Sequence, residues 1–305
     1  MPRLRADAGS WRNELRRIED LGYDTVAVSE HVTDGWVLEP LAAMAFAAAS
    51  TTRLHVLSLV LTNDLHHPAL LAKAAATIDA LSDGRLELGI GAGWKQHDYR
   101  TVGLPFDPPA ERIDRLAEAL EIVRQYFSRE HVHFTGSHYA VDNMESLPRR
   151  SGFGGPPLFV GGGGPRMLEL AGRVADIAGI HLRQTTPTLD PAAVLDLTAE
   201  CVDRKIERVR AAAAAAGRPT PTFQFTCYHV DITDAPSHGP KCRSSFSGHL
   251  AEASDMLKDS PAVLTGTVAE CAEQLLAWHE RYGITYWHLG QDVEAGGAII
   301  AQLSR

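Results

Sequence analysis

The sequence predicts an α/β protein built as a (β/α)8 TIM barrel, and three observations support this fold class. Short β-branched or apolar runs alternate with longer helical patterns along almost the whole chain. The apolar runs are nearly continuous, which is typical of parallel strands covered by helices. No linker rich in Pro, Gly or Ser divides the 305 residues, so we expect a single domain over residues 1–305.

The first half of the chain alternates strands and helices with clear end signals. Ser10 can cap a helix in which apolar side chains recur at helical spacing, and Gly22 suits its end. Pro40 and Pro68 are each well placed in a first helical turn. The expected elements are a helix at 10–21, a strand at 25–31, a helix at 40–50, a strand at 54–61, a helix at 68–81, a strand at 85–93 and a helix at 110–127.

The second half repeats this alternation, and seven strands are expected after the first helix. An eighth strand would complete the barrel, but only residues 2–5 precede the first helix, so we expect that strand to be short or missing. Two excursions interrupt the pattern, one near 131–156 that starts as a hairpin and a long loop near 233–260 with one short helix. The other elements are strands at 158–161, 177–182, 222–230 and 284–290, and helices at 166–174, 191–216 and 267–282.

Composition excludes several classes of protein. The formal net charge is −9 and no Lys/Arg block occurs, which argues against a nucleic-acid or anionic-membrane partner. No apolar run approaches the ~20 residues that cross a bilayer, and no secretory signal is visible, so we expect a cytoplasmic protein. The four cysteines show no C-x-x-C pattern and are expected to be reduced thiols.

A glycine-rich segment, FVGGGGP at 159–165, lies between a predicted strand and a predicted helix. Backbone N–H groups left bare at a helix N-terminus stabilise a phosphate through hydrogen bonds and the helix dipole. We therefore expect an anion site at Gly162, Gly163 and Gly164. The alternative is that the glycines only allow a tight turn with positive φ. The spaced glycines Gly89 and Gly91 do not form a Rossmann fingerprint, because Trp94 stands three positions later.

Histidines lie at or just after the carboxyl ends of several predicted strands, where barrel enzymes carry their catalytic groups. His31 and His181 are the clearest candidates, since an imidazole can exchange a proton near neutral pH. Glu30 beside His31, and Asp98 beside His97, are candidate acid–base pairs. A surface or supporting role is the alternative for each histidine taken alone. No metal site is expected, because the spacing of ligand-type residues fits none, and no nucleophile motif is present.

Five segments, taken in order, resemble the luciferase-like monooxygenase superfamily, and specifically its branch of oxidoreductases that use the deazaflavin coenzyme F420. They cover nearly the whole chain, and the run to H-P followed by L-S-x-G-R-x-x-L-G-x-G is a specific signature. The segments are EDLGYDTVAVSEH at 19–31, the run from LVLTNDLHHP to LELGIGAGW at 59–94, GLPFDPPAER at 103–112, PPLFVGGGGPRMLELAGRVADIAG at 156–179 and SPAVLTGTVAECAEQL at 260–275.

The resemblance implies a TIM barrel with the deazaflavin across its C-terminal mouth, and hydride transfer to or from the ring. His31 matches the proton donor beside the ring. The bond between Leu59 and Val60 matches a non-prolyl cis bulge that backs the ring. The resemblance also implies substrate contacts at Trp36, His181 and Gln184. The implied cofactor contacts are Glu30, Leu59, Val60, Thr62, Asn63, Trp94, His97, Gly162, Gly163, Gly164, Arg166 and Met167.

Two positions depart from the sugar-phosphate dehydrogenases of this branch. Trp94 replaces a catalytic glutamate, and Gln184 replaces a lysine that holds the substrate phosphate. Oxidation of glucose 6-phosphate is therefore disfavoured, and we expect reduction of a C=C or C=N bond in a small organic substrate. The alternatives are an FMN-dependent luciferase-like monooxygenase and a barrel that binds a cofactor without turnover. A homodimer is a further expectation from the family.

Overall fold

The computed structural model describes residues 7–32, 38–146, 154–183, 191–234, 254–257 and 259–304. The chain forms two compact units, which we treat separately. The N-terminal unit contains Arg3–Arg16 and Asp24–Val160, and the C-terminal unit contains Arg17–Tyr23 and Gly161–Arg305. Helix α1 (Ala8–Asp20) starts in the first and ends in the second. It begins before Ser10, because the Asp7 carboxylate accepts hydrogen bonds from the Ser10 N–H at 2.8 Å and hydroxyl at 2.9 Å.

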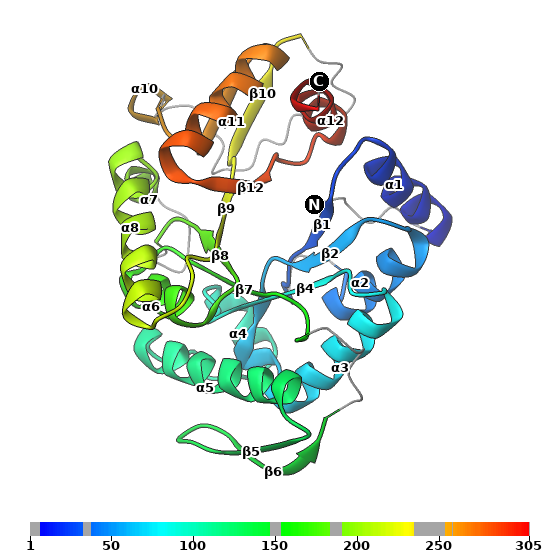
Figure 1. Ribbon diagram of the computed structural model, residues 1–305, viewed down its shortest axis with the longest axis vertical. Helices are drawn as coiled ribbons and strands as arrows, with labels where there is room; N and C mark the ends of the chain where they lie inside the picture. The colour runs from blue at the N-terminus through cyan, green and yellow to red at the C-terminus, as the bar shows by residue number, and fades with distance from the viewer. Residues whose placement is uncertain are drawn as a thin grey trace. The chain divides into compact units, whose positions relative to one another are not determined.

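The N-terminal unit is a parallel sheet with helices packed against it (Figure 1). Its strand order is β1-β2-β4-β7, and the short strand β3 pairs with β4. Val26↔Val56 and Leu88↔Leu158 are among the registered pairs, and all four side chains are buried. The strands are β1 (Thr25–Val28), β2 (His55–Ser58), β3 (Leu61–Thr62), β4 (Leu86–Gly91) and β7 (Leu158–Gly162), and the helices are α2 (Pro40–Ser50), η1 (Asn63–Leu65), α3 (Pro68–Leu81), α4 (Gln96–Thr101) and α5 (Pro109–Ser128).

The spaced glycines of β4 allow β2 and β3 to approach it closely. A Cβ on Gly89 would lie 1.9 Å from the Ser58 carbonyl oxygen, and one on Gly91 would lie 2.8 Å from the Val60 side chain. The buried Ser58 hydroxyl donates to the Gly89 carbonyl at 2.9 Å and accepts from the Gly89 N–H at 2.8 Å. These glycines therefore serve packing between strands, because no side chain fits at either position.

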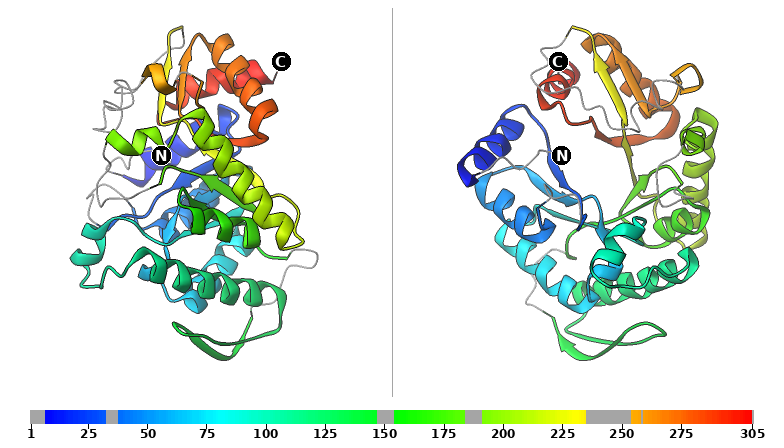
Figure 2. Two further views of the ribbon diagram at one scale, coloured as in Figure 1. Left: turned by 90° about the vertical axis from the view of Figure 1, so that its left-hand side faces the viewer. Right: turned by 180° about the vertical axis from the view of Figure 1, so that it is seen from behind.

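The first excursion begins as the predicted hairpin. Strands β5 (His131–Thr135) and β6 (Ala140–Glu145) pair antiparallel and extend beyond α5 (Figure 2). Glu118 of α5 fixes the turn, since its carboxylate accepts the backbone N–H groups of Ser137, His138 and Tyr139 at 2.7–3.1 Å.

The C-terminal unit continues from the last residues of β7 into a second run of parallel strands, β8, β9 and β12, while β10 and β11 form a separate parallel pair. Helix α11 is well capped, because Thr267 and Glu270 form a reciprocal capping box. The strands are β8 (Ile177–Ile180), β9 (Thr222–Thr226), β10 (His229–Ile232), β11 (Val263–Gly266) and β12 (Ile284–His288), and the helices are α6 (Pro165–Val174), α7 (Pro191–Leu195), α8 (Ala199–Ala215), α10 (Ser254–Leu257), α11 (Val268–Tyr282) and α12 (Val293–Leu303).

Three predicted elements are interrupted in the structure. The helix expected at 191–216 is two helices, α7 and α8, because the chain turns at 196–198 and the Asp196 carboxylate there accepts from Lys205. The strand expected at 222–230 ends at Thr226, after which β10 leaves to pair with β11. The strand expected at 54–61 breaks at the cis bond between Leu59 and Val60.

Some expectations fall on residues that the structure does not describe. The first strand expected at 2–5 and most of the excursion near 233–260 lie outside the described residues, apart from α10 and the ends of that segment. No helix in the described part of the chain is long and apolar enough to cross a membrane. The expectation of a single domain stays a prediction.

Candidate functional site

His31 lies just after β1 in the N-terminal unit and pairs with a carboxylate far along the chain. Its Nδ1 is 2.7 Å from Oδ2 of Asp98 on α4, and the Asp98 side chain is 7% exposed. The half-buried imidazole also packs against the Trp94 ring in a T-shaped arrangement, with the ring centroids 5.8 Å apart. Because an ionised carboxylate only accepts hydrogen bonds, Asp98 holds the proton on Nδ1 and leaves Nε2 for exchange with another group.

Glu30, the neighbour of His31, has a different partner. Its buried carboxylate accepts from the Thr62 backbone N–H at 2.6 Å and lies 2.8 Å from Nε2 of His66. The adjacent residues Glu30 and His31, and likewise His97 and Asp98, are therefore not paired as the sequence suggested. Glu30 and His31 follow a strand, where neighbouring side chains point to opposite sides. His97 and Asp98 lie on α4, where neighbouring side chains also point in different directions, so that Asp98 meets His31 and His97 meets Arg100.

The segment after β2 carries the next group of predicted residues. The peptide bond between Leu59 and Val60 is cis, as the resemblance implied. Asn63 is 1% exposed, and its amide donates to the Tyr139 hydroxyl at 3.0 Å and to the Asp64 carboxylate at 3.3 Å. Thr62 and Asn63 are thus fixed by Glu30 on one side and by the β5–β6 hairpin on the other.

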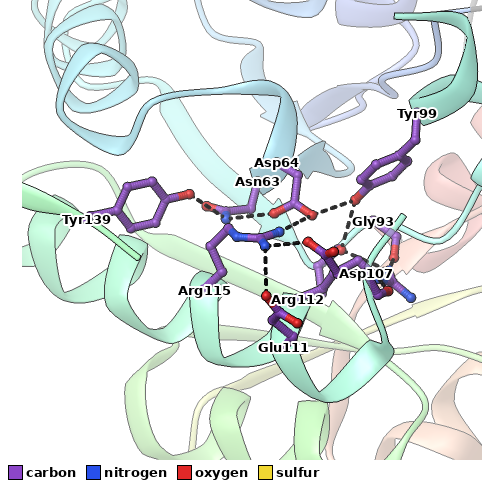
Figure 3. Close-up of polar contacts among 10 residues, drawn as sticks. Asn63, Asp64, Gly93, Tyr99, Asp107, Glu111, Arg112, Arg115 and Tyr139 are labelled. Atoms are coloured by element: carbon purple, nitrogen blue, oxygen red, sulfur yellow. Dashed lines mark hydrogen bonds and ion pairs between the residues drawn. The ribbon is translucent and has the colours of Figure 1, made fainter. Parts of the chain in front are cut away.

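Two arginines of α5 organise the loops around this segment, and the sequence analysis did not single them out (Figure 3). Arg115 forms ion pairs with Asp64 at 2.9 Å and with Asp107 at 2.5 Å. The buried Arg112 donates to the carbonyls of Ala92 and Gly93, immediately before Trp94. The only sequence signal was the segment GLPFDPPAER, which ends at Arg112.

The glycine-rich segment forms the end of β7 and the start of α6 in the C-terminal unit. None of Gly162, Gly163 and Gly164 has a positive φ, so the tight-turn explanation is wrong for these three. A Cβ on Gly163 would lie 2.3–2.4 Å from the backbone of 181–183, whereas a Cβ on Gly164 would meet nothing within 4 Å. Gly164 is the N-cap of α6 and supplies no side-chain acceptor, so this helix N-terminus is open.

His181 follows β8 in the same unit. Its Nδ1 lies 3.2 Å from the Tyr228 hydroxyl, and its backbone carbonyl accepts from the buried Lys205 ammonium at 2.7 Å. Burial lowers the pKa of His181 to about 4, and the positive charge of Lys205 adds to this effect. His181 is therefore neutral at physiological pH.

The remaining predicted residues take separate positions. Trp94 is 38% exposed, and Met167 is buried in the first turn of α6 beside the exposed Arg166. His97 is exposed on α4, and its Nδ1 lies 3.0 Å from the Arg100 guanidinium. Trp36 and Gln184 lie outside the described residues.

No group of three metal-ligating side chains gathers within the described ranges. Cys201, Cys227 and Cys271 are free thiols, and Cys242 falls in an undescribed segment. Burial raises the pKa of the Cys271 thiol to about 11, which leaves it protonated and unreactive.

Comparison with known proteins shows that the chain belongs to the luciferase-like monooxygenase family, whose sequence model matches residues 5–238. The resemblance identified from the sequence is therefore confirmed. Curated relatives include F420-dependent enzymes. An F420-dependent glucose-6-phosphate dehydrogenase of Kineococcus radiotolerans is 35% identical over 164 residues, which make up 52% of this chain and 48% of that protein.

A 5,10-methylenetetrahydromethanopterin reductase of Archaeoglobus fulgidus is 32% identical over 176 residues, or 57% of this chain and 48% of that protein. The matches span about half the length of these two curated relatives. Among solved structures, an F420-dependent secondary alcohol dehydrogenase in complex with an F420–acetone adduct matches with a TM-score of 0.74 at 18% identity, over 99% of this chain and 95% of that chain. The predicted α/β TIM-barrel fold class is thus confirmed.

Proposed function

We propose that this protein is an F420-dependent oxidoreductase that transfers a hydride between the deazaflavin and a small organic substrate, in the direction that reduces a C=C or C=N bond. The observation that carries the proposal is the imidazole of His31, which follows β1 and is held at 2.7 Å by Asp98 of α4, in a chain whose curated relatives include an F420-dependent dehydrogenase. A hydride acceptor also needs a proton, and His31 is placed to supply one.

The described residues fit such a cofactor at the start of α6. The open N-terminus of α6, with Gly162, Gly163 and Gly164 before it, suits a phosphate group of the anionic cofactor, and Arg166 and Met167 would lie at that end. The other predicted cofactor contacts are Glu30, Leu59, Val60, Thr62, Asn63, Trp94 and His97.

F420 would supply the hydride when bound, while the chain supplies position and a proton. Asp98 fixes the His31 tautomer, so that Nε2 receives a proton from solvent and donates it to the substrate. Glu30 acts as a positioning residue, because both of its carboxylate oxygens are occupied by Thr62 and His66.

The reductive direction and an uncharged substrate are supported by the residues around His31. The exposed Trp94 ring beside the imidazole offers an apolar surface, which suits an unsaturated molecule better than a charged sugar. The reductase among the relatives is consistent with this direction. Trp36 and Gln184 remain proposed substrate contacts, and a cytoplasmic location and a homodimer remain predictions.

An FMN-dependent monooxygenase is the second candidate, because the family is named for monooxygenases and a structural neighbour, a Baeyer-Villiger monooxygenase, is in complex with FMN. A barrel that binds a cofactor without turnover is the third. Oxygen uptake with reduced FMN would favour the second candidate over the first.

The proposal is tested by titrating the purified protein with F420 and with FMN while following cofactor fluorescence. We expect F420 to bind more tightly, and we expect His31→Ala to lower the rate of hydride transfer about 100-fold or more without changing the F420 affinity. His133→Ala, on the exposed hairpin, is the control. Tight FMN binding without F420 binding would overturn the proposal, as would full activity in His31→Ala.

A further inference from the structure

Polar side chains line one face of the strands of the C-terminal unit, and His181 is the one among them that was already expected to contact substrate. In the parallel register, Tyr286 pairs with Gln224 and His288 pairs with Thr226. The register of β8 pairs Ile180 with Phe225, which puts His181 level with Thr226 one residue further on. Since registered partners share a face, Gln224, Thr226 and His288 project to the same side.

The helices of the unit cover the opposite face of these strands. Phe223 lies under the guanidinium of Arg210 from α8, at 5.5 Å, and the Trp287 ring is 5.9 Å from the Trp278 ring of α11. The side chains that alternate with Phe223 and Trp287 therefore point away from α8 and α11. This alternation separates an apolar face, packed against helices, from a polar face.

Two atoms of the polar face are buried without a hydrogen-bond partner. The Oε1 atom of Gln224, a residue 1% exposed, has none, and neither does Nδ1 of His288. The Gln224 amide donates instead to the Thr226 hydroxyl at 3.3 Å. A buried polar atom left without a partner destabilises the fold, and a ligand that supplied the partner would remove this cost.

The charge at this face is close to zero. Burial lowers the pKa of His288 to about 3, with His181 contributing, and the pKa of His181 itself lies near 4. Burial also raises the pKa of Tyr228, so its phenol stays protonated. The nearby Lys205 ammonium is bound by Asp196 and by the His181 carbonyl. Neutral donors and acceptors of this kind suit an uncharged oxygen and do not compensate a phosphate.

We propose that His181, Tyr228 and His288, supported by Gln224, form a hydrogen-bonding subsite that recognises an uncharged carbonyl or hydroxyl oxygen of the substrate. This inference rests on the proposed function and narrows its substrate class to neutral oxygenated molecules. His181, Tyr228 and His288 are each only partly buried, so a ligand can reach their side chains. His288 Nδ1 contacts the substrate oxygen, and Gln224 Oε1 accepts a hydrogen bond where that oxygen belongs to a hydroxyl group, while the Gln224 amide nitrogen stays bound to Thr226.

The test uses 2-cyclohexen-1-one as a neutral probe and follows the imidazole signals of the full chain by NMR, with and without F420. We expect the His181 and His288 signals to shift on addition of the enone and to stay unchanged with glucose 6-phosphate. We expect His288→Phe to weaken enone binding about tenfold, and His288→Asn to retain most of it because an amide keeps a polar atom near the Nδ1 position. His133→Phe on the exposed hairpin is the matched control.

The outcomes separate the two proposals. If the protein binds the enone at His181 and His288 but does not bind F420, the subsite is supported and the proposed function is overturned. A protein that binds F420 but shows no shift at either histidine with saturating enone overturns the subsite. Equal enone binding by the wild type and a folded His288→Phe variant, judged by its thermal unfolding, also overturns it.

Discussion

At the scale of single residues, the candidates His31 and Glu30 each pair with a side chain that lies far away in the sequence. His31 was a candidate because it follows a predicted strand, but its partner Asp98 is separated from it by 67 positions. Glu30 was expected to act beside His31 and instead contacts Thr62 and His66. Such pairs depend on which strand ends meet in the fold, and periodicity along a single chain does not contain that information.

The His31–Asp98 pair leads to a prediction about Asp98→Asn. An amide can donate to Nδ1, which would reverse the tautomer and place the proton on Nε2 before the substrate arrives. We expect the rate of hydride transfer to fall about tenfold or more, with F420 affinity unchanged. Stopped-flow absorbance of the deazaflavin measures the rate, and fluorescence titration measures the affinity.

Asp142→Asn provides the matched control, because Asp142 forms an exposed pair with His133 at 3.7 Å. That variant should behave like the wild type in both measurements. The pH dependence of the rate distinguishes positioning from a general loss of structure, since only a change at His31 alters it. An Asp98→Asn variant with a wild-type rate and pH profile would show that Asp98 does not position the imidazole.

At the scale of elements, helices with strong end signals were predicted accurately, and α2 and α3 start and end at the expected residues. The errors lie where tertiary contacts interrupt a continuous pattern. Pro191 and the six-alanine run predicted one continuous helix. The structure has a turn between α7 and α8, where the Asp196 carboxylate accepts a hydrogen bond from Lys205. Likewise, the single strand predicted at 222–230 is two strands, because β9 ends and β10 pairs with β11 in a separate sheet. A continuous apolar run does not show where a chain passes from one sheet to another.

The glycines between β7 and α6 allow a direct test of close packing at the level of these elements. Gly163→Ala would place a Cβ 2.3 Å from the Leu182 backbone, so we expect it to lower the free energy of unfolding by about 1–3 kcal/mol. Gly164→Ala has open space around the new Cβ, and we expect a change within about 0.5 kcal/mol. Urea unfolding of both variants measures the difference, and equal stabilities would contradict the assigned role of Gly163.

At the scale of the whole molecule, the net charge of −9 does not indicate whether the protein can bind an anionic ligand. The proposed cofactor is anionic, so an acidic chain must bind it through local N–H groups such as those at the start of α6 and not through its overall field. The candidate residues are also divided, with His31 and Asp98 in the N-terminal unit and the glycine-rich segment and His181 in the C-terminal unit.

Stability against acid is the property of the whole molecule that these charges allow us to predict. Burial lowers the pKa of His181 to about 4 and that of His288 to about 3, below the unfolded value of about 6.5. The unfolded chain therefore binds more protons than the folded chain between these values, and stability falls as the pH drops below about 6.5 until it levels off near the folded pKa values. His55 opposes this trend, because Glu87 raises the pKa of His55 and this pair stabilises the fold in acid.

We expect urea midpoints to fall from pH 7 to pH 5 in the wild type and in the control His133→Phe, and to fall less in His288→Phe. The same acid dependence in all three proteins would show that His288 is not held neutral by the fold.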